Sequence, residues 1–125
     1  MNNINDYFFH IKSLIILNSA ILNWRIIRED IQSTKGFFRY KLTLKDGSIL
    51  EMFEFIQITI TGLKVDKYSF HWQNIDGTLR KRWDNAPHHR DISTYPHHLH
   101  DSREDNILPH QPVTAEYILS MISAS

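Results

Sequence analysis

The sequence predicts an α+β domain: an antiparallel meander sheet of about five strands, with an N-terminal and a C-terminal helix packed on one face. Asp46-Gly47 and Asp76-Gly77 each separate two stretches rich in β-branched and aromatic residues, and Asp-Gly is a strong hairpin signal. Apolar residues at helical spacing near both ends of the chain predict the two helices. A long His- and Pro-rich loop should follow the last strand.

The N-terminal helix should begin near Asn5 or Asp6, because both residue types favour the N-cap position, and should end at Asn18 and Ser19. Its apolar stripe consists of Phe8, Ile11, Leu14 and Ile15. A short turn then leads to a strand from residue 24 to about residue 31.

Four more strands are expected over residues 37–45, 48–58, 63–73 and 78–84. The turn between the second and third of them, at Thr61-Gly62, is a weaker signal than the two Asp-Gly turns. Residues 85–112, where proline and polar residues dominate, should be mostly irregular, and so long a loop is often functional. Thr114 can cap a last helix, which should bury Tyr117, Ile118, Met121 and Ile122.

Composition limits the class of protein. The 125 residues suit one domain, residues 1–125, with 42% apolar and 22% charged residues. The absence of cysteine excludes disulfides, thiolate metal sites and cysteine nucleophiles. A net charge of zero excludes a generally basic nucleic-acid-binding surface, so any polyanion site must be a local patch. Because we see no secretion signal and no membrane-spanning run, we expect a cytoplasmic protein with no membrane partner.

Two-residue turns would fix which side chains share a face of the sheet. They place Lys45 opposite Ser48, and therefore Arg39 opposite Glu54. They also place Ile75 opposite Thr78. The expected aromatic face, on which the helices should pack, consists of Phe38, Tyr40, Phe53, Phe55, Tyr68, Phe70, Trp72 and Trp83. The opposite face pairs Ser69 with Asp84, His71 with Arg82, and Gln73 with Arg80.

This second face combines bases, acids and histidine, and the His-rich loop leaves from its end. Six of the eight histidines fall between His88 and His110. The combination suits RNA cleavage, which needs a base for the 2′-hydroxyl, an acid for the 5′-oxygen and cations for the phosphate. Catalytic candidates are His71, Arg82, Asp84, His88, His89, His97, His98 and His100. Substrate-binding candidates are Arg39, Lys67 and Arg80 for phosphates, and Trp83 or Tyr95 for stacking a base.

Three alternatives compete with RNA cleavage. The polar face could simply be solvated, with ordinary cross-strand ion pairs. A site for a divalent metal could form from His98 and His100, completed by His88 or His89 with Asp84 or Asp91, although no cofactor is required by the pattern. A Ser-His-Asp hydrolase built on Ser69 is rejected, because a flat strand does not present a nucleophile and no oxyanion hole is visible.

Several motifs carry a family resemblance over nearly the whole chain: W-R-I-I-R-E at 24–29, F-R-Y-K-L-T-L-K-D-G-S-I-L-E at 38–51, Y-S-F-H-W-Q at 68–73, R-W-D-N-A-P-H-H at 82–89 and Y-P-H-H-L-H at 95–100. With these motifs in this order, the chain resembles the TumE family of small prokaryotic proteins. The two His-containing blocks are its most specific part. One departure is the apolar stretch Ile56-Gln-Ile-Thr-Ile-Thr, which puts the third turn in doubt.

The resemblance implies a toxin of a type II toxin–antitoxin module, neutralised by an antitoxin with a helix-turn-helix domain. It carries no catalytic residues over to this chain. Many small toxins with a sheet and flanking helices cut mRNA, often on the ribosome, which is an analogy of fold only. We therefore expect a ribonuclease or another inhibitor of translation that acts on RNA or the ribosome. A metal-binding protein, a metal-dependent hydrolase and a non-catalytic interaction protein are the alternatives, and a homodimer is left open.

Overall fold

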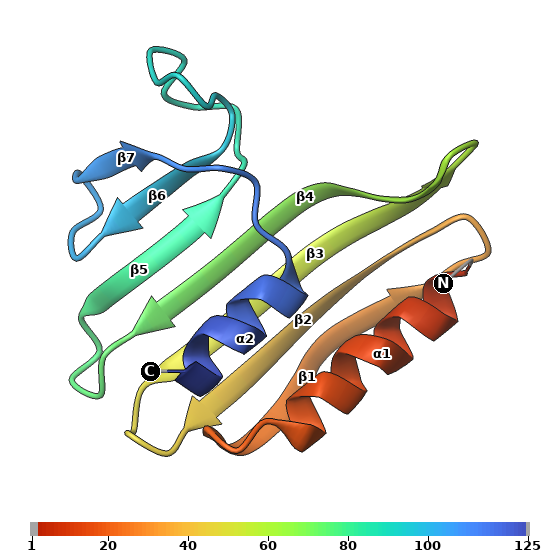
Figure 1. The fold of residues 1–125 in the computed structure, drawn as a ribbon, viewed down its shortest axis with the longest axis horizontal. Helices are drawn as coiled ribbons and strands as arrows, with labels where there is room; N and C mark the ends of the chain where they lie inside the picture. The colour runs from red at the N-terminus through yellow and green to blue at the C-terminus, as the bar shows by residue number, and fades with distance from the viewer. Residues whose placement is uncertain (1–2, 125) are drawn as a thin grey trace.

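The computed structural model describes residues 3–124, which form one antiparallel sheet with two helices over one of its faces (Figure 1). The sheet has seven strands in sequence order, β1 to β7. The elements are α1 (Ile4–Leu17), β1 (Ile21–Ile31), β2 (Lys35–Leu44), β3 (Ile49–Thr59), β4 (Gly62–Gln73), β5 (Leu79–Asp84), β6 (His98–Asp101), β7 (Ile107–Pro109) and α2 (Ala115–Ala124). Neither helix within residues 3–124 is long and apolar enough to cross a bilayer.

The α+β meander and both terminal helices are confirmed, but the number of strands differs from the prediction. The two additional strands, β6 and β7, lie in the segment predicted to be irregular. They are short, and β6 consists of His-Leu-His-Asp, so neither carries the long β-branched pattern that marks a strand in sequence. Their backbone hydrogen bonds with the edge of β5 and with each other, rather than side-chain preference, extend the sheet.

The helix ends follow capping chemistry, with one shift from the prediction. Asn3, not Asn5 or Asp6, caps α1, and its side chain accepts a hydrogen bond from the Asp6 backbone at 2.7 Å. Thr114 caps α2 as predicted, because its hydroxyl accepts from the backbone N–H of Tyr117 at 3.1 Å. The Tyr117 side chain is half exposed, however, and not buried as predicted.

The register between β2 and β3 differs by one residue from the prediction. Leu44 donates its backbone N–H to Ser48 at 2.9 Å, so the connection has three residues with Gly47 at a φ of 86°. Asp-Gly also favours this longer turn, whose third residue adopts the left-handed conformation. As a result Arg39 lies opposite Phe53 and not opposite Glu54.

A one-residue shift moves every side chain of a strand to the other face. Phe53 therefore leaves the predicted aromatic face, as does Phe55. The side chains of β3 that enter the core are instead Leu50, Met52, Glu54 and Ile56. We call the face of the sheet that the helices leave uncovered the open face; it includes Arg39, Phe53, Ser69, His71, Arg82 and Asp84.

The last hairpin also has a three-residue connection, since Asn74 donates its backbone N–H to Thr78 at 2.8 Å. An irregularity at Trp72 and Gln73 offsets the extra residue. The predicted pairs His71 with Arg82 and Ser69 with Asp84 are therefore confirmed, while Gln73 pairs with Leu79. In the middle hairpin Thr59 pairs with Gly62, so its turn lies one residue before the predicted Thr61-Gly62.

A buried carboxylate, Glu54, links both helices to the sheet. Its side chain is fully buried. It accepts hydrogen bonds from the Tyr7 hydroxyl of α1 at 2.5 Å and from the Ala115 backbone of α2 at 3.0 Å. Burial raises the pKa of Glu54 to about 7, although both hydrogen bonds favour the charged form.

Candidate functional site

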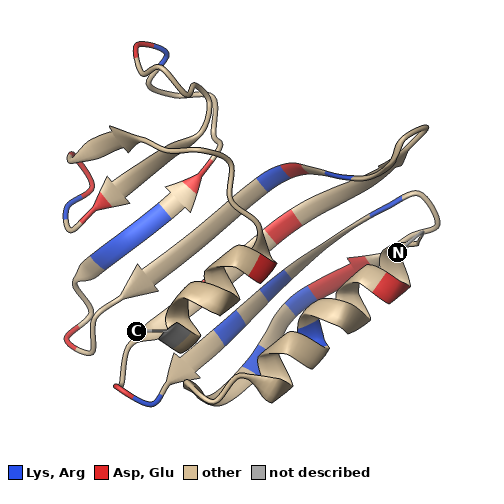
Figure 2. Cartoon of the chain, in the orientation of Figure 1, with Lys and Arg blue, Asp and Glu red and all other residues tan. Residues whose placement is uncertain are grey.

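The open face carries a pocket of about 620 Å³ where the end of β5 and the following loop meet β2, β3 and β4. Figure 2 shows a continuous basic stretch on β5 and, after one uncharged position, an acidic residue at the tip of the strand. The side chains of the pocket combine positive charge, aromatic rings and a carboxylate. Those that matter for its chemistry are Arg39, Phe53, Lys67, Arg82, Asp84 and Tyr95.

One wall of the pocket pairs cations with aromatic rings. The guanidinium of Arg39 lies 4.8 Å from the centre of the Phe53 ring and 3.2 Å from the carboxylate of Glu51. Tyr95 is 37% exposed, with the Arg90 guanidinium 5.9 Å from its ring centre. Flat rings beside guanidinium groups are suited to nucleobases and their phosphates.

Asp84 is the buried carboxylate of the pocket and is tightly held. Its Oδ1 lies 2.9 Å from His98 Nε2 and accepts a hydrogen bond from the Ala86 backbone at 3.0 Å. Its Oδ2 accepts from Arg82 Nε at 3.1 Å. The antiparallel pairing of β5 with β6 produces these contacts, because it sets Asp84 opposite His98 and Arg82 opposite His100.

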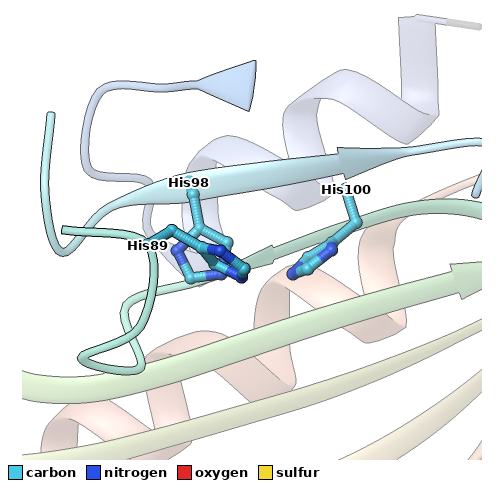
Figure 3. A group of neighbouring side chains, drawn as sticks. All are labelled: His89, His98 and His100. Carbon is cyan, nitrogen blue, oxygen red and sulfur yellow. The ribbon is translucent and has the colours of Figure 1, made fainter. Parts of the chain in front are cut away.

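Three imidazoles gather behind Asp84 and form the histidine cluster: His89, His98 and His100 (Figure 3). One nitrogen of each ring lies within 4.8 Å of the corresponding nitrogens of the other two. His98 and His100 are buried on the same side of β6 with ring centres 4.9 Å apart, while His89 reaches them from the loop. Burial lowers the pKa of His100.

The structure brings together most of the predicted site residues. Arg39, Lys67, Arg82, Asp84 and Tyr95 line the pocket. His71 lies beside Arg82 on the same face. The histidine cluster adjoins them through the contact of His98 with Asp84.

Four predicted residues lie elsewhere. His88 is exposed, so of the two histidines predicted to complete a metal site with His98 and His100, His89 joins them and His88 does not. The His97 ring forms a 2.8 Å hydrogen bond with the Tyr68 hydroxyl and does not belong to the histidine cluster. Trp83 is buried in the core, where it cannot stack a base. Arg80, at the far end of β5, donates a hydrogen bond to the Asn74 side chain at 2.7 Å, and its guanidinium lies over the Trp72 ring.

Phe53 is a pocket residue whose predicted position, on the aromatic face, is wrong. A signal was present: Leu50, Met52 and Ile56 alternate through β3, and in the predicted register they would have pointed away from the helices. Apolar residues on an unprotected face argue against a register. The alternative of a three-residue turn would have placed them in the core.

A family model described as Toxin TumE matches residues 11–123. Neither the curated proteins nor the solved structures contain a significant match to this chain.

Proposed function

We propose that this chain, which belongs to the TumE toxin family, arrests growth by cutting RNA in the pocket on the open face. The toxin role follows from the family. The RNA chemistry is supported by one observation: a single pocket joins three cations, three aromatic rings and two carboxylates, of which Asp84 contacts an imidazole.

The cations suit a phosphodiester. Arg39, Lys67 and Arg82 come from three strands and face one pocket, so a strand of RNA would meet positive charge along its backbone. Because the whole chain has no net charge, this attraction would be local. Phe53 and Tyr95 would each offer a ring on which an unpaired base can stack.

The acid–base groups suit transphosphorylation. In this reaction the 2′-hydroxyl loses its proton to a base, the O2′–P bond forms and the P–O5′ bond breaks, and an acid protonates the leaving 5′-oxygen. Asp84 would take the first proton on Oδ2, the oxygen on the Arg82 side, while its Oδ1 remains on His98. His71 would supply the second proton. Arg82 would stabilise the charge on the phosphorane oxygens. The products would be a 2′,3′-cyclic phosphate and a 5′-hydroxyl.

The test is to express the wild type, Asp84→Asn, His71→Ala and the control His88→Ala from a tightly repressed promoter, and to map cellular RNA ends. His88→Ala removes an exposed imidazole from the same loop. We expect the wild type and control to arrest growth and leave 5′-hydroxyl ends. Each site variant should cleave more slowly by a factor on the order of 10² or more. Growth arrest without new RNA ends would refute cleavage and favour inhibition of translation by binding.

Membership in a toxin family implies an antitoxin partner. We propose that this antitoxin carries a helix-turn-helix domain and that the target is RNA, free or on the ribosome, in the cytoplasm. Co-expression with the gene beside this one should restore growth, and co-purification should yield a complex. Size-exclusion chromatography of the toxin alone would test a homodimer.

A further inference from the structure

We propose that His89, His98, His100 and Asp84 bind one divalent transition-metal ion such as zinc. The inference deepens the proposed function by giving its site a cofactor, and the catalytic meaning of the ion rests on that function. Figure 3 shows the three imidazoles directed toward one another from the loop and from β6.

Hydrogen bonds define the protonation of the two buried rings. His98 Nδ1 lies 2.9 Å from the Pro96 carbonyl oxygen, and His100 Nδ1 lies 2.8 Å from that of Glu104. Since a carbonyl oxygen can only accept, both Nδ1 atoms carry the proton. In a neutral ring the lone pair then belongs to Nε2, which contacts Asp84 in His98 and Arg82 in His100. Metal-binding histidines share this pattern, in which the far nitrogen donates to a carbonyl and fixes the ring.

The contact between His98 and Asp84 brings two hydrogen-bond acceptors together, and a cation between them would stabilise it. The Nε2 lone pair of neutral His98 and the Oδ1 of Asp84 are both acceptors, yet they lie 2.9 Å apart. Either a proton or a metal ion bound by both atoms resolves this conflict. A proton would serve only this pair, whereas a metal ion would also use the Nε2 of His100 and the ring of His89.

Arg82 is the competitor for the cluster, because one of its nitrogens lies 3.2 Å from His100 Nε2. The guanidinium also contacts Asp84 Oδ2 at 3.1 Å and Glu104 at 3.1 Å. When a metal ion takes the His100 lone pair, Arg82 retains these two carboxylate partners. Asp84 can therefore bind the ion through Oδ1 and keep its ion pair with Arg82 through Oδ2.

The spacing is close to what a metal ion requires. Zinc–nitrogen bonds of about 2.0–2.1 Å in a tetrahedron separate neighbouring nitrogens by about 3.4 Å. The three imidazole nitrogens lie within 4.8 Å of one another, at most about 1.4 Å more than this separation. His89 has a φ of 58°, a left-handed conformation that is strained for a non-glycine residue. In that conformation its ring lies 5.2 Å from that of His98.

The donor set selects the kind of ion. Imidazole nitrogens with one carboxylate oxygen suit zinc and its first-row neighbours, whereas calcium and magnesium prefer oxygen ligands throughout. When bound, the ion would supply a Lewis acid beside the pocket that holds the phosphate.

The test is a calorimetric titration of untagged, chelator-stripped protein with zinc chloride. We expect the wild type to bind one equivalent. His89→Ala, which removes a partly exposed loop residue and spares the core, should weaken the affinity at least about tenfold, and His100→Ala should do the same. His88→Ala is the matched control, because His88 neighbours His89 but lies outside the cluster, and it should bind like the wild type.

The inference is overturned when the wild type shows no saturable binding of one equivalent, or when His88→Ala loses as much affinity as His89→Ala. Titration of the wild type with cobalt chloride needs no variant: d–d absorption typical of a low-symmetry nitrogen–oxygen site is expected, and the spectrum of hexa-aquo cobalt contradicts the proposal. RNA cleavage by a protein that does not bind zinc refutes the metal site and leaves the proposed function standing. Zinc binding without RNA cleavage refutes the proposed function and leaves the metal site standing.

Discussion

Replacement of Glu54 by glutamine should remove a pH dependence of folding stability. Burial raises the pKa of Glu54 from its usual 4.5 to about 7, which corresponds to about 3 kcal/mol. The folded state thus binds this proton more tightly than the unfolded state. The resulting stabilisation is complete below about pH 4.5 and is lost as the pH rises through about 7.

Glutamine suits this position because it satisfies the same partners without a charge. Its oxygen can accept from the Ala115 backbone, and its amide can donate to the Tyr7 hydroxyl oxygen. Between about pH 5.5 and pH 8 the free energy of unfolding of the wild type should fall by about 2 kcal/mol more than that of Glu54→Gln.

Urea unfolding followed by tryptophan fluorescence at a series of pH values measures this difference. Glu51→Gln is the matched control, since Glu51 lies on the same strand but faces water and Arg39 on the open face. It should retain the pH dependence of the wild type. Equal pH dependence in the wild type and in Glu54→Gln would refute the assignment of a buried, proton-binding carboxylate.

Three further predictions rest on particular contacts. Gly47→Ala should lower the free energy of unfolding, measured with urea, more than Gly77→Ala does. Both glycines have φ near 87°, but of the two only Gly47 has a close neighbour: a Cβ there would lie 2.5 Å from the Ile75 side chain. Arg39→Ala should weaken RNA binding and lower the slope of log affinity against log salt by about 0.7, as measured by fluorescence anisotropy; an unchanged slope would remove Arg39 from the phosphate contacts. Phe8→Ala, which empties a core position that is 1% exposed, should cost about 3–5 kcal/mol of unfolding free energy, while Phe9→Ala, at a position 73% exposed, should cost less than about 0.5 kcal/mol.

Part of the site was accessible from the sequence because its strands pair through short hairpins. Asp76-Gly77 predicted that β4 and β5 are neighbours, and the pairs His71 with Arg82 and Ser69 with Asp84 are confirmed. The predicted turn length was nevertheless one residue too short, and only the irregularity at Trp72 restored the register. The predicted turn at Asp46-Gly47 was also one residue too short, and no irregularity in the strands restored the register there. Phe53 was therefore predicted on the core face, which is wrong.

The sequence by itself determined the α+β class, the terminal helices and the positions of the hairpins, because periodicity, capping and turn chemistry act between residues that are neighbours in the chain. Only the tertiary structure decided which face of β3 enters the core and where the histidines gather. Asp-Gly permits two turn lengths. The choice between them depends on the helices, which are distant in the chain and which cover Leu50, Met52 and Glu54 in the core. The histidine cluster likewise exists because β6 returns to pair with β5, a contact between segments separated by an irregular loop that no local pattern encodes.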